Sequence, residues 1–247
     1  MTVSPATPHV DPRDAASHRF GLTPERWAAL EGKAVWITGA GTGFGRCFAV
    51  ALAAAGAVPV LSGRRREKLE ETRAEINALG LPGERAVAIP VDITDAESVA
   101  RAAREIDDRI GGLDGLINNA GTFVTNLGSW PLAESSPADW DRQLDLNLRG
   151  QWLVTRAALP LLETRGAIKT VFVSSEAGWA FTPSAGLYNV SKAAINNLAA
   201  SFAAECAARC ADLDVQINTI NPGEARTEMN QGSTESPYIA VSITLML

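Results

Sequence analysis

The stretch that decides the fold is Thr38-Gly-Ala-Gly-Thr-Gly-Phe-Gly45. It joins an apolar run of strand type, Ala34–Thr38, to a helical segment, Phe44–Ala55. Glycines let a backbone adopt positive φ and approach a ligand closely. The helix that follows offers free N–H groups and a partial positive charge to an anion. Glycines also make plain turns, but the strand–turn–helix context favours a phosphate-binding turn.

The rest of the chain repeats this strand-then-helix unit. No predicted strand has a polar alternate face, so both faces are expected to be covered, as in a parallel sheet between helical layers. The sequence predicts one α/β domain with a doubly wound parallel sheet of Rossmann type. The further strands are Val58–Ser62, Ala86–Val91, Gly115–Asn118, Thr170–Ser175 and Val215–Ile220, and the further helices Glu67–Leu79, Ala96–Ile110, Ala138–Glu163 and Tyr188–Arg209.

The chain divides into an N-terminal extension, residues 1–31, and the α/β domain, residues 32–247. Within the extension, Thr23 as N-cap and Pro24 at the first helical position predict a short helix. Residues 1–20 contain no apolar core of the kind a secretory signal needs. We therefore expect a cytoplasmic protein.

Composition narrows the possible partners. Of 247 residues, 46% are hydrophobic and 20% charged, with a net charge of −6, which fits a folded domain and not a disordered chain. Without clustered Lys and Arg, nucleic acid is not expected to bind. The longest apolar run, Cys47–Leu61, is shorter than the ~20 residues of a membrane span. No membrane partner is predicted.

Histidine and cysteine are scarce. Both histidines, His9 and His18, lie in the polar N-terminal tail, which argues against a histidine-based triad or metal site. The three cysteines are too few for a disulfide framework. Cys206 and Cys210 are four residues apart and could share a helix face, either as small apolar side chains or as a metal or redox pair. We predict no metal.

The spacing T-G-x-x-x-G-x-G resembles the short-chain dehydrogenase/reductase superfamily, in its single-domain branch. Further matching motifs follow in the family's order across residues 33–229. The resemblance implies an NAD(P)-dependent oxidoreductase that transfers a hydride between nicotinamide and an alcohol or ketone. These motifs are Asp92 after the third strand, Asn118–Gly121 after the fourth, Asn147 in a long helix, Ser175 at the fifth, Tyr188 and Lys192, and Asn218–Gly223 with Thr227.

Tyr188 and Lys192 are four residues apart on a predicted helix, so both side chains lie on one face. Free tyrosine has a pKa near ~10, and a nearby ammonium lowers it. Tyr188 is therefore the predicted general acid/base and Lys192 the group that tunes it. Ser175 is expected to bind the substrate oxygen; Ser174 competes, but the 13-residue gap to Tyr188 favours Ser175. The resemblance also implies that Asn147 fixes a water that relays protons from Lys192.

The second strand ends at Ser62 without a nearby carboxylate for a ribose 2′-hydroxyl. Arg64 suits a 2′-phosphate, which favours NADP(H) and leaves NAD(H) possible. Thr42 counts against NADP(H), since many NADP-preferring relatives carry a basic residue there. Arg65 and Arg66 could merely solvate a helix start. The predicted cofactor-binding residues are Gly39, Thr42, Gly43, Phe44, Gly45, Arg64, Asp92, Ile93, Asn119, Gly121, Tyr188, Lys192, Gly223 and Thr227.

Two of these cofactor residues keep a structural alternative. Asp92 would, by resemblance, accept a hydrogen bond from the adenine amino group, or it could only cap a turn. Thr227 would contact the nicotinamide carboxamide or phosphates, or it could be a helix N-cap. For the small-molecule alcohol or ketone, Trp130, Trp179 and Phe181 favour an apolar or ring-bearing substrate. Glu176, next to Ser175, could contact a polar group of that substrate or point to solvent.

Relatives continue past the sixth strand to a seventh, whereas this sequence stops at Leu247. We therefore expect either a truncated C-terminus that leaves the sixth strand as an exposed edge, or another surface that covers this edge. By resemblance, the helices over 138–163 and 188–209 would pair with their copies in a homodimer or homotetramer.

Two other functions remain open at this point. A non-catalytic cofactor-binding sensor or structural subunit is argued against by Tyr188, Lys192 and Ser175, and supported by the truncated end. A sugar-nucleotide epimerase or dehydratase would carry T-G-x-x-G-x-x-G and a longer C-terminal domain, and this sequence has neither.

Overall fold

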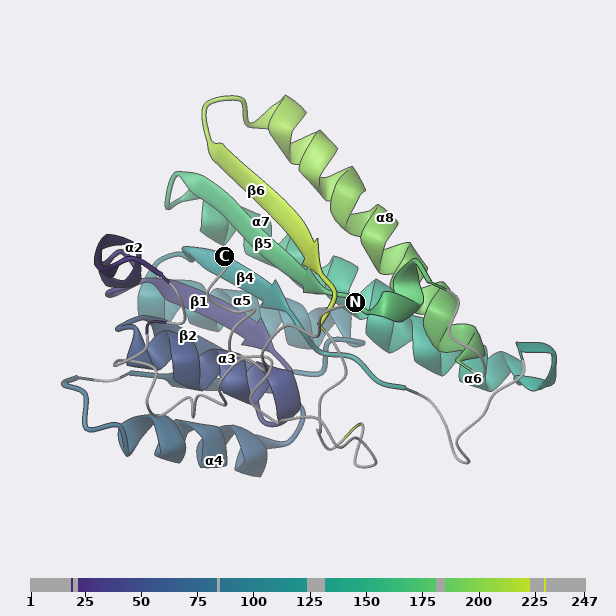
Figure 1. The fold of residues 1–247 in the computed structure, drawn as a ribbon, viewed down its shortest axis with the longest axis horizontal. Coiled ribbons are helices and arrows are strands. Elements are labelled where there is room, and N and C mark those ends of the chain that lie inside the picture. The colour runs from purple at the N-terminus through teal and green to yellow at the C-terminus, as the bar shows by residue number, and fades with distance from the viewer. Residues whose placement is uncertain are drawn as a thin grey trace, which may run out of the picture.

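The computed structural model describes residues 19, 22–83, 85–123, 132–180, 185–222 and 229. Its centre is a six-stranded parallel sheet in the order β3-β2-β1-β4-β5-β6 (Figure 1). The order reverses between β1 and β4, which creates the crevice where ligands bind in open α/β sheets. The strands are β1 (Ala34–Thr38), β2 (Val58–Gly63), β3 (Val87–Pro90), β4 (Gly115–Asn118), β5 (Ala167–Val173) and β6 (Asp214–Ile220).

Helices cover both faces of the sheet, as expected for a doubly wound fold. One buried cluster joins the sheet to α3 and α4, and another joins its opposite face to α5, α7 and α8. Figure 1 shows α8 lying alongside β6. The helices are α2 (Pro24–Ala28), α3 (Gly43–Ala54), α4 (Arg66–Asn77), α5 (Ala96–Ile110), α6 (Pro137–Leu144), α7 (Gly150–Glu163) and α8 (Gly186–Arg209), with short turns η3 (Leu132–Glu134), η4 (Asp145–Arg149) and η5 (Glu176–Gly178).

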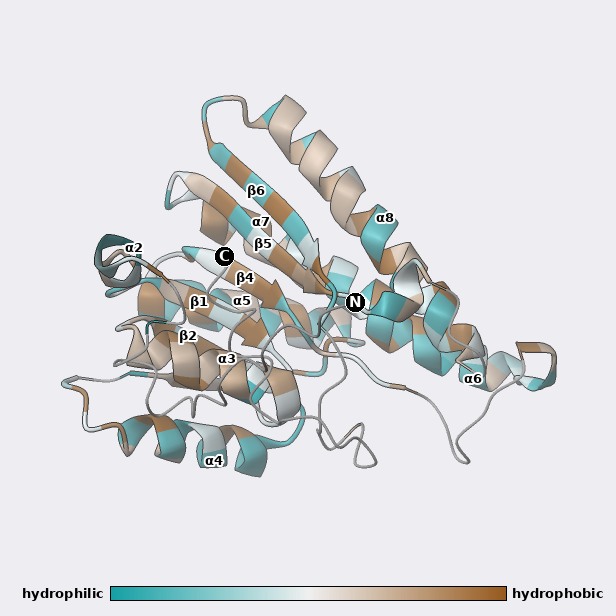
Figure 2. Cartoon of the chain, in the orientation of Figure 1, coloured by the Kyte–Doolittle hydropathy of each residue, from teal (hydrophilic) through white to brown (hydrophobic). Residues whose placement is uncertain are grey.

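The central strands are buried on both sides, which explains why they lack a polar face. All five residues of β1 are buried, and Trp36 and Ile37 have no exposed surface. The Trp36 indole N–H, which points into the core, donates to the Ser62 hydroxyl of β2 at 2.7 Å. Hydrophobic residues run along the central strands in Figure 2, whereas α4 carries many hydrophilic ones. The predicted parallel sheet is confirmed.

The short helix predicted near Pro24 is present as α2. Thr23 is its N-cap, and the side chain accepts a hydrogen bond from the Arg26 amide. At the other end of the fold, β6 pairs with β5 in parallel register from Ala167↔Asp214 to Val173↔Ile220. Within the part of the chain that the structure describes, β6 has no second strand partner.

One helix differs from the prediction. The segment predicted as one helix, Ala138–Glu163, is divided into α6, the π-helical turn η4 and α7. A π turn holds one residue more than an α turn, and such turns are frequent at functional sites. Hydrophobic spacing did not reveal it because the apolar pattern continues through the turn. The predicted fifth strand, Thr170–Ser175, is also shifted, since β5 ends at Val173 and leaves both serines beyond it.

Candidate active site

The glycine-rich turn forms a cradle at the carboxyl end of β1. Gly39 has φ +68°, a conformation that favours glycine. A Cβ on Gly45 would collide with the Gly39 carbonyl oxygen and lie 2.6 Å from Asn119 Nδ2. Thr42 is the N-cap of α3 but makes no capping hydrogen bond with its side chain. The first N–H groups of α3 are therefore not taken by that hydroxyl, which suits an anion at this helix end.

The turn after β4 closes the other side of the cradle. The Thr38 hydroxyl accepts the amides of Asn119 and Ala120, both at 3.0 Å. Asn119 Nδ2 donates to the Thr38 carbonyl at 2.8 Å. The turn thus ties β4 to β1. Sequence analysis missed Thr38, whose partners lie 81 and 82 residues away.

Three of the predicted cofactor residues, Arg64, Asp92 and Ile93, follow the ends of β2 and β3. Arg64 is exposed beyond β2 and has no hydrogen-bond or ion-pair partner among the described residues. The Asp92 carboxylate accepts the Thr94 amide at 3.0 Å and the Thr94 hydroxyl at 2.8 Å, so Asp92 does make a turn. Ile93 is buried against Gly150, where a Cβ would lie 2.8 Å from the Ile93 side chain. Of the two charged residues among these three, Arg64 is the one without a polar partner among the described residues.

Ser175 and Tyr188 meet between the end of β5 and the start of α8. Their side chains share a hydrogen bond. Ser175 is held in place because its hydroxyl oxygen also accepts the Ala177 amide at 3.2 Å, as N-cap of η5. Ser174 turns away and donates to the Lys192 carbonyl at 3.3 Å. The structure therefore brings Ser175, and not Ser174, to the phenol.

Lys192 is buried beneath Tyr188. Its ammonium donates to the Val173 carbonyl at 2.8 Å and lies 5.5 Å from the centre of the Tyr188 ring. Burial lowers the pKa of Lys192 to about 8. Burial also raises the pKa of Tyr188, and the hydrogen bond with Ser175 opposes that rise. The expected lowering by Lys192 does not dominate here, because the ammonium bonds a carbonyl and lies over the ring, not at the hydroxyl.

Asn147 lies in the π turn η4 and is fully buried. Its side chain bonds both main-chain groups of Thr122: Oδ1 accepts the amide at 2.7 Å, and Nδ2 donates to the carbonyl at 2.9 Å. Nδ2 also donates to the Ser191 hydroxyl at 3.0 Å. A Cβ on Gly121 would lie 3.3 Å from Asn147 Oδ1 and 3.7 Å from Lys192 Nζ. Asn147, Gly121 and Lys192 therefore form one cluster.

A row of buried polar side chains along α6, η4 and α7 faces the chain that leaves β4. Its members are four residues apart on the helical side. The partners of three of them are two apart on the extended side, and the fourth member shares a partner with the third. Four helical residues rise about 6 Å and two extended residues about 6.6 Å, so the repeats match. This polar ladder pairs Thr155 with Asn118 (2.9 Å), Gln151 with the Ala120 carbonyl (3.0 Å), and both Asn147 (2.9 Å) and Gln143 (2.7 Å) with the Thr122 carbonyl. Only Asn147 was identified from the sequence; the spacing of four was the signal that could have found the others.

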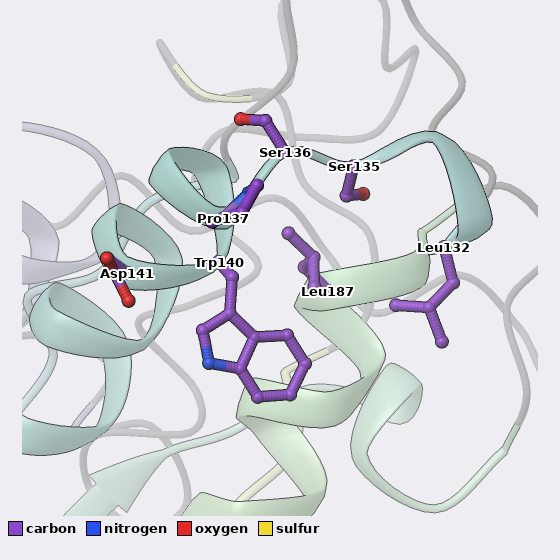
Figure 3. A pocket seen from close by; sticks show the side chains of 7 residues that line it. All are labelled: Leu132, Ser135, Ser136, Pro137, Trp140, Asp141 and Leu187. Atoms are coloured by element: carbon purple, nitrogen blue, oxygen red, sulfur yellow. The ribbon is translucent and has the colours of Figure 1, made fainter.

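A pocket of about 360 Å³ opens beside the start of α8 (Figure 3). Figure 3 shows the Trp140 ring and the Leu187 and Leu132 side chains at its wall. Leu187 directly precedes Tyr188. The lining residues are Leu132, Ser135, Ser136, Pro137, Trp140, Asp141 and Leu187. A second aromatic side chain, Trp179, follows η5 and is 75% exposed.

Four predicted residues lie outside the described residues: Gly223 and Thr227 of the cofactor set, and Trp130 and Phe181 of the substrate set. The described residues contain no group of three or more His, Cys, Asp and Glu that could hold a metal ion. The three cysteines are free thiols. None of the helices described there is long and apolar enough to cross a membrane.

Comparison with known proteins identifies the family. Residues 33–237 match the short chain dehydrogenase family. A short chain dehydrogenase of Monascus purpureus, mpl6, is 37% identical over 203 residues, covering 80% of this chain and 66% of the relative. A hydroxynaphthalene reductase-like protein of Metarhizium majus, Arp2, is 34% identical over 201 residues, covering 81% and 71%. The match thus spans just under two thirds of the length of the first of these relatives.

The solved structures agree with the sequence relatives. A short chain dehydrogenase of Shigella flexneri, described as complexed with NADP, superimposes with a TM-score of 0.79 and 29% identity, covering 90% of this chain and 92% of that one. The chain therefore belongs to the short-chain dehydrogenase/reductase family, and its single Rossmann-type domain is the fold of that family.

Proposed function

We propose that this chain is an NADP(H)-dependent oxidoreductase that transfers a hydride between the nicotinamide and an alcohol or ketone. The observation that carries the proposal is the cluster of Tyr188, Ser175, Lys192 and Asn147 at the carboxyl edge of the sheet, beside the glycine cradle. A sensor without turnover would not need a hydroxyl pair next to a buried ammonium. The family match and the NADP complex of a structural relative support the same function.

The residues of the cradle fit a nicotinamide dinucleotide. Gly39, Gly43 and Gly45 would lie against the pyrophosphate. Gly39 and Gly43 have positive φ, and side chains at Gly39 or Gly45 would collide with the neighbouring Asn119 turn and so distort the cradle. Arg64 would pair with the 2′-phosphate, and Ile93 and Asp92 would border the adenine. Asn119 and Gly121 would border the ribose on the nicotinamide side, with Tyr188 and Lys192. When bound, the cofactor supplies or accepts the hydride.

Tyr188 moves the proton. Burial raises its pKa, so the phenol is protonated at neutral pH and is ready to donate to a ketone oxygen. Ser175 would hold that oxygen by a second hydrogen bond. Lys192, with a pKa of about 8, is largely protonated at neutral pH and stabilises the phenolate left behind. Asn147 fixes the main chain at Thr122 next to Lys192, and we propose that it carries the relay to solvent.

The substrate that we propose is a ring-bearing ketone or alcohol. Two exposed apolar side chains, Leu132 (53%) and Trp140 (43%), line a pocket with Leu187, the residue before Tyr188. Trp179, which follows Ser175 by four residues, is 75% exposed. Flat apolar rings pack well against such side chains. The name of one relative, a hydroxynaphthalene reductase-like protein, refers to a bicyclic aromatic compound.

We also propose a homodimer or homotetramer formed through α7 and α8. In α8, the small side chains of Ala193, Ala200, Ala204 and Ala208 are exposed, so a second helix can approach closely. In α7, the Arg156 guanidinium lies 4.7 Å from the centre of the partly buried Trp152 ring. Sedimentation velocity would measure the mass in solution, and a monomer at micromolar concentration would contradict this assembly.

The function is tested by replacing Tyr188 with Phe, which removes only the hydroxyl. We expect ketone reduction to fall by about 10²- to 10⁴-fold, the usual contribution of a general acid. NADPH binding, followed by nicotinamide fluorescence, should be nearly unchanged because the cradle is untouched. Turnover of Tyr188→Phe at the wild-type rate would remove Tyr188 from the mechanism. Failure of the wild type to bind NADPH or NADH would refute the proposed cofactor.

A further inference from the structure

We propose that Gln143 is a positioning residue for the reaction: it holds the main chain at Thr122 so that Phe123 fixes the ring of Tyr188. The proposal rests on the proposed function of Tyr188. Gln143 lies in the last turn of α6, is 1% exposed, and is the end of the polar ladder nearest the active site.

The first step is the contact between Gln143 and Thr122. Gln143 Nε2 donates to the Thr122 carbonyl at 2.7 Å. The same carbonyl accepts Asn147 Nδ2 at 2.9 Å, so both of its lone pairs are engaged. The Thr122 amide is fixed as well, at 2.7 Å from Asn147 Oδ1. The peptide groups on either side of Thr122 are thus held from one side by two amide side chains.

The second step leads from Thr122 to the phenol. Phe123, the next residue, packs edge-to-face on Tyr188, with ring centres 5.0 Å apart and planes at 83°. This is a preferred geometry for an aromatic pair. A shift of the Thr122 carbonyl would therefore move the Phe123 ring against Tyr188. The Phe123 ring limits how far the phenol can swing from the position that Ser175 requires.

A second chain of hydrogen bonds connects Asn147 to the main chain of Tyr188. Asn147 Nδ2 donates to the Ser191 hydroxyl at 3.0 Å, and that hydroxyl donates to the Tyr188 carbonyl at 2.8 Å. Gln143 and Asn147 share the Thr122 carbonyl. Loss of Gln143 therefore affects both connections to Tyr188, the one through Phe123 and the one through Asn147 and Ser191. Buried hydrogen-bonded networks of this kind fix one arrangement of their members. Gln143 therefore acts through other residues and does not touch the reacting atoms.

The test uses the small number of tyrosines. The chain has two, Tyr188 and Tyr238. In a Tyr238→Phe background labelled with 3-fluorotyrosine, one ¹⁹F resonance reports Tyr188. Gln143→Met keeps the side-chain volume but removes the donor, and should move this resonance toward its position in the denatured protein. Phe123→Leu should move it in the same direction. Thr155→Val, which removes a buried hydroxyl at the far end of the polar ladder, is the matched control and should leave it unchanged.

Kinetics give the second readout, with NADPH and 2-tetralone, a bicyclic ketone. We expect Gln143→Met to lower kcat about tenfold, because small misplacements of a catalytic group are costly. KM and the NADPH Kd should stay within about twofold, since binding energy is not removed. The double variant with Phe123→Leu should be little slower than the slower single variant, because both act on one contact.

The outcomes distinguish a failure of the positioning role of Gln143 from a failure of the proposed function of Tyr188. An unchanged ¹⁹F resonance in Gln143→Met, or an equal shift in Thr155→Val, would refute the positioning role. Additive effects of Gln143→Met and Phe123→Leu on kcat would also refute it. If Tyr188→Phe kept full turnover, the proposed function would fail, while the ¹⁹F spectra would still decide whether Gln143 positions the ring.

Discussion

The two halves of the sheet build their parts of the site differently. The half with β1, β2 and α3 offers main-chain groups: the start of α3 has no side-chain cap, and glycines pack closely on the neighbouring turn. The half with β4, β5 and α8 offers buried side chains held by hydrogen bonds. The helix starts show the contrast: Thr42 makes no side-chain cap on α3, whereas Ser136 closes α6 with a capping box. We call the first the open half and the second the satisfied half. In the satisfied half most buried polar side chains bond the protein itself, although Asn118 Oδ1 and Gln151 Oε1 have no partner among the described residues.

The largest effect should come from filling the open half. Gly45→Ala places a Cβ on the Gly39 carbonyl oxygen and near Asn119 Nδ2, so the cradle must widen. Overpacking of about 1–3 kcal/mol corresponds to roughly 5- to 150-fold weaker NADPH binding. Gly115→Ala, whose Cβ would lie 3.6 Å from a Val35 methyl, is the control and should bind normally. Fluorescence titration measures both, and equal binding by the two variants would contradict the cradle.

In the satisfied half, Lys192→Met should stabilise the protein. The pKa of Lys192 is about 8 in the folded protein and 10.5 in the unfolded chain. Below pH 8 Lys192 is charged in both states, so the folded protein bears the full free-energy cost of burying the charge. Between pH 8 and 10.5 only the unfolded state holds the proton, so wild-type stability rises and the advantage of the variant shrinks. We expect a gain of about 1–3 kcal/mol at pH 7. Urea unfolding of both proteins at pH 7 and pH 10 measures the difference in the free energy of unfolding. A difference that grows with pH would contradict the prediction.

The preference for NADP(H) over NAD(H) depends on Arg64, an exposed charge in the open half. Arg64→Ala should weaken NADPH binding about tenfold, or roughly 1.4 kcal/mol, because it removes a charge-assisted bond to the 2′-phosphate. NADH binding should be unchanged, since NADH lacks that phosphate. Glu97→Ala, an exposed site on α5, serves as the surface control. Equal weakening of both cofactors, or tighter binding of NADH by the wild type, would overturn the preference for NADP(H).

The smallest effect compares the two helix starts directly. Ser136→Ala should lower the free energy of unfolding by about 1 kcal/mol, because the hydroxyl accepts the Asp139 amide at 3.2 Å. Thr42→Ala should change the stability of the ligand-free protein by less than about 0.5 kcal/mol, since its hydroxyl makes no such bond. Thermal unfolding of the two variants decides the matter. Equal losses would mean that α3 is closed by its own cap after all.

The open half could be read from the sequence because its signals are local. The glycines, the strand before them and the helix after them span about twenty residues, and β1, α3 and β2 fall within a residue of the predicted bounds. The helix start after Thr23-Pro24 was found for the same reason. Helix and strand types follow from periodicity, which is a property of consecutive residues.

The satisfied half was less predictable because its contacts join distant segments. Gln143 and Thr122 are 21 residues apart, and Thr38 and Asn119 are 81 apart. No single-sequence pattern states such pairs. The π turn was missed because its hydrophobic pattern resembles an α-helix. The pKa of Tyr188 was predicted in the wrong direction, since burial cannot be weighed against a neighbouring charge before the fold is known.

The π turn η4 also restricts which insertions and deletions the fold can tolerate. Four-residue steps drift by about 40° per step on an α-helix, so a polar row from Gln143 to Thr155 would turn away from β4 without a correction. The extra residue in 145–149 corrects it. A deletion of one residue there would rotate α7 by about 100° and bury its apolar side chains in the place of its amides. The length of this segment should therefore vary less among related sequences than the identity of its exposed residues.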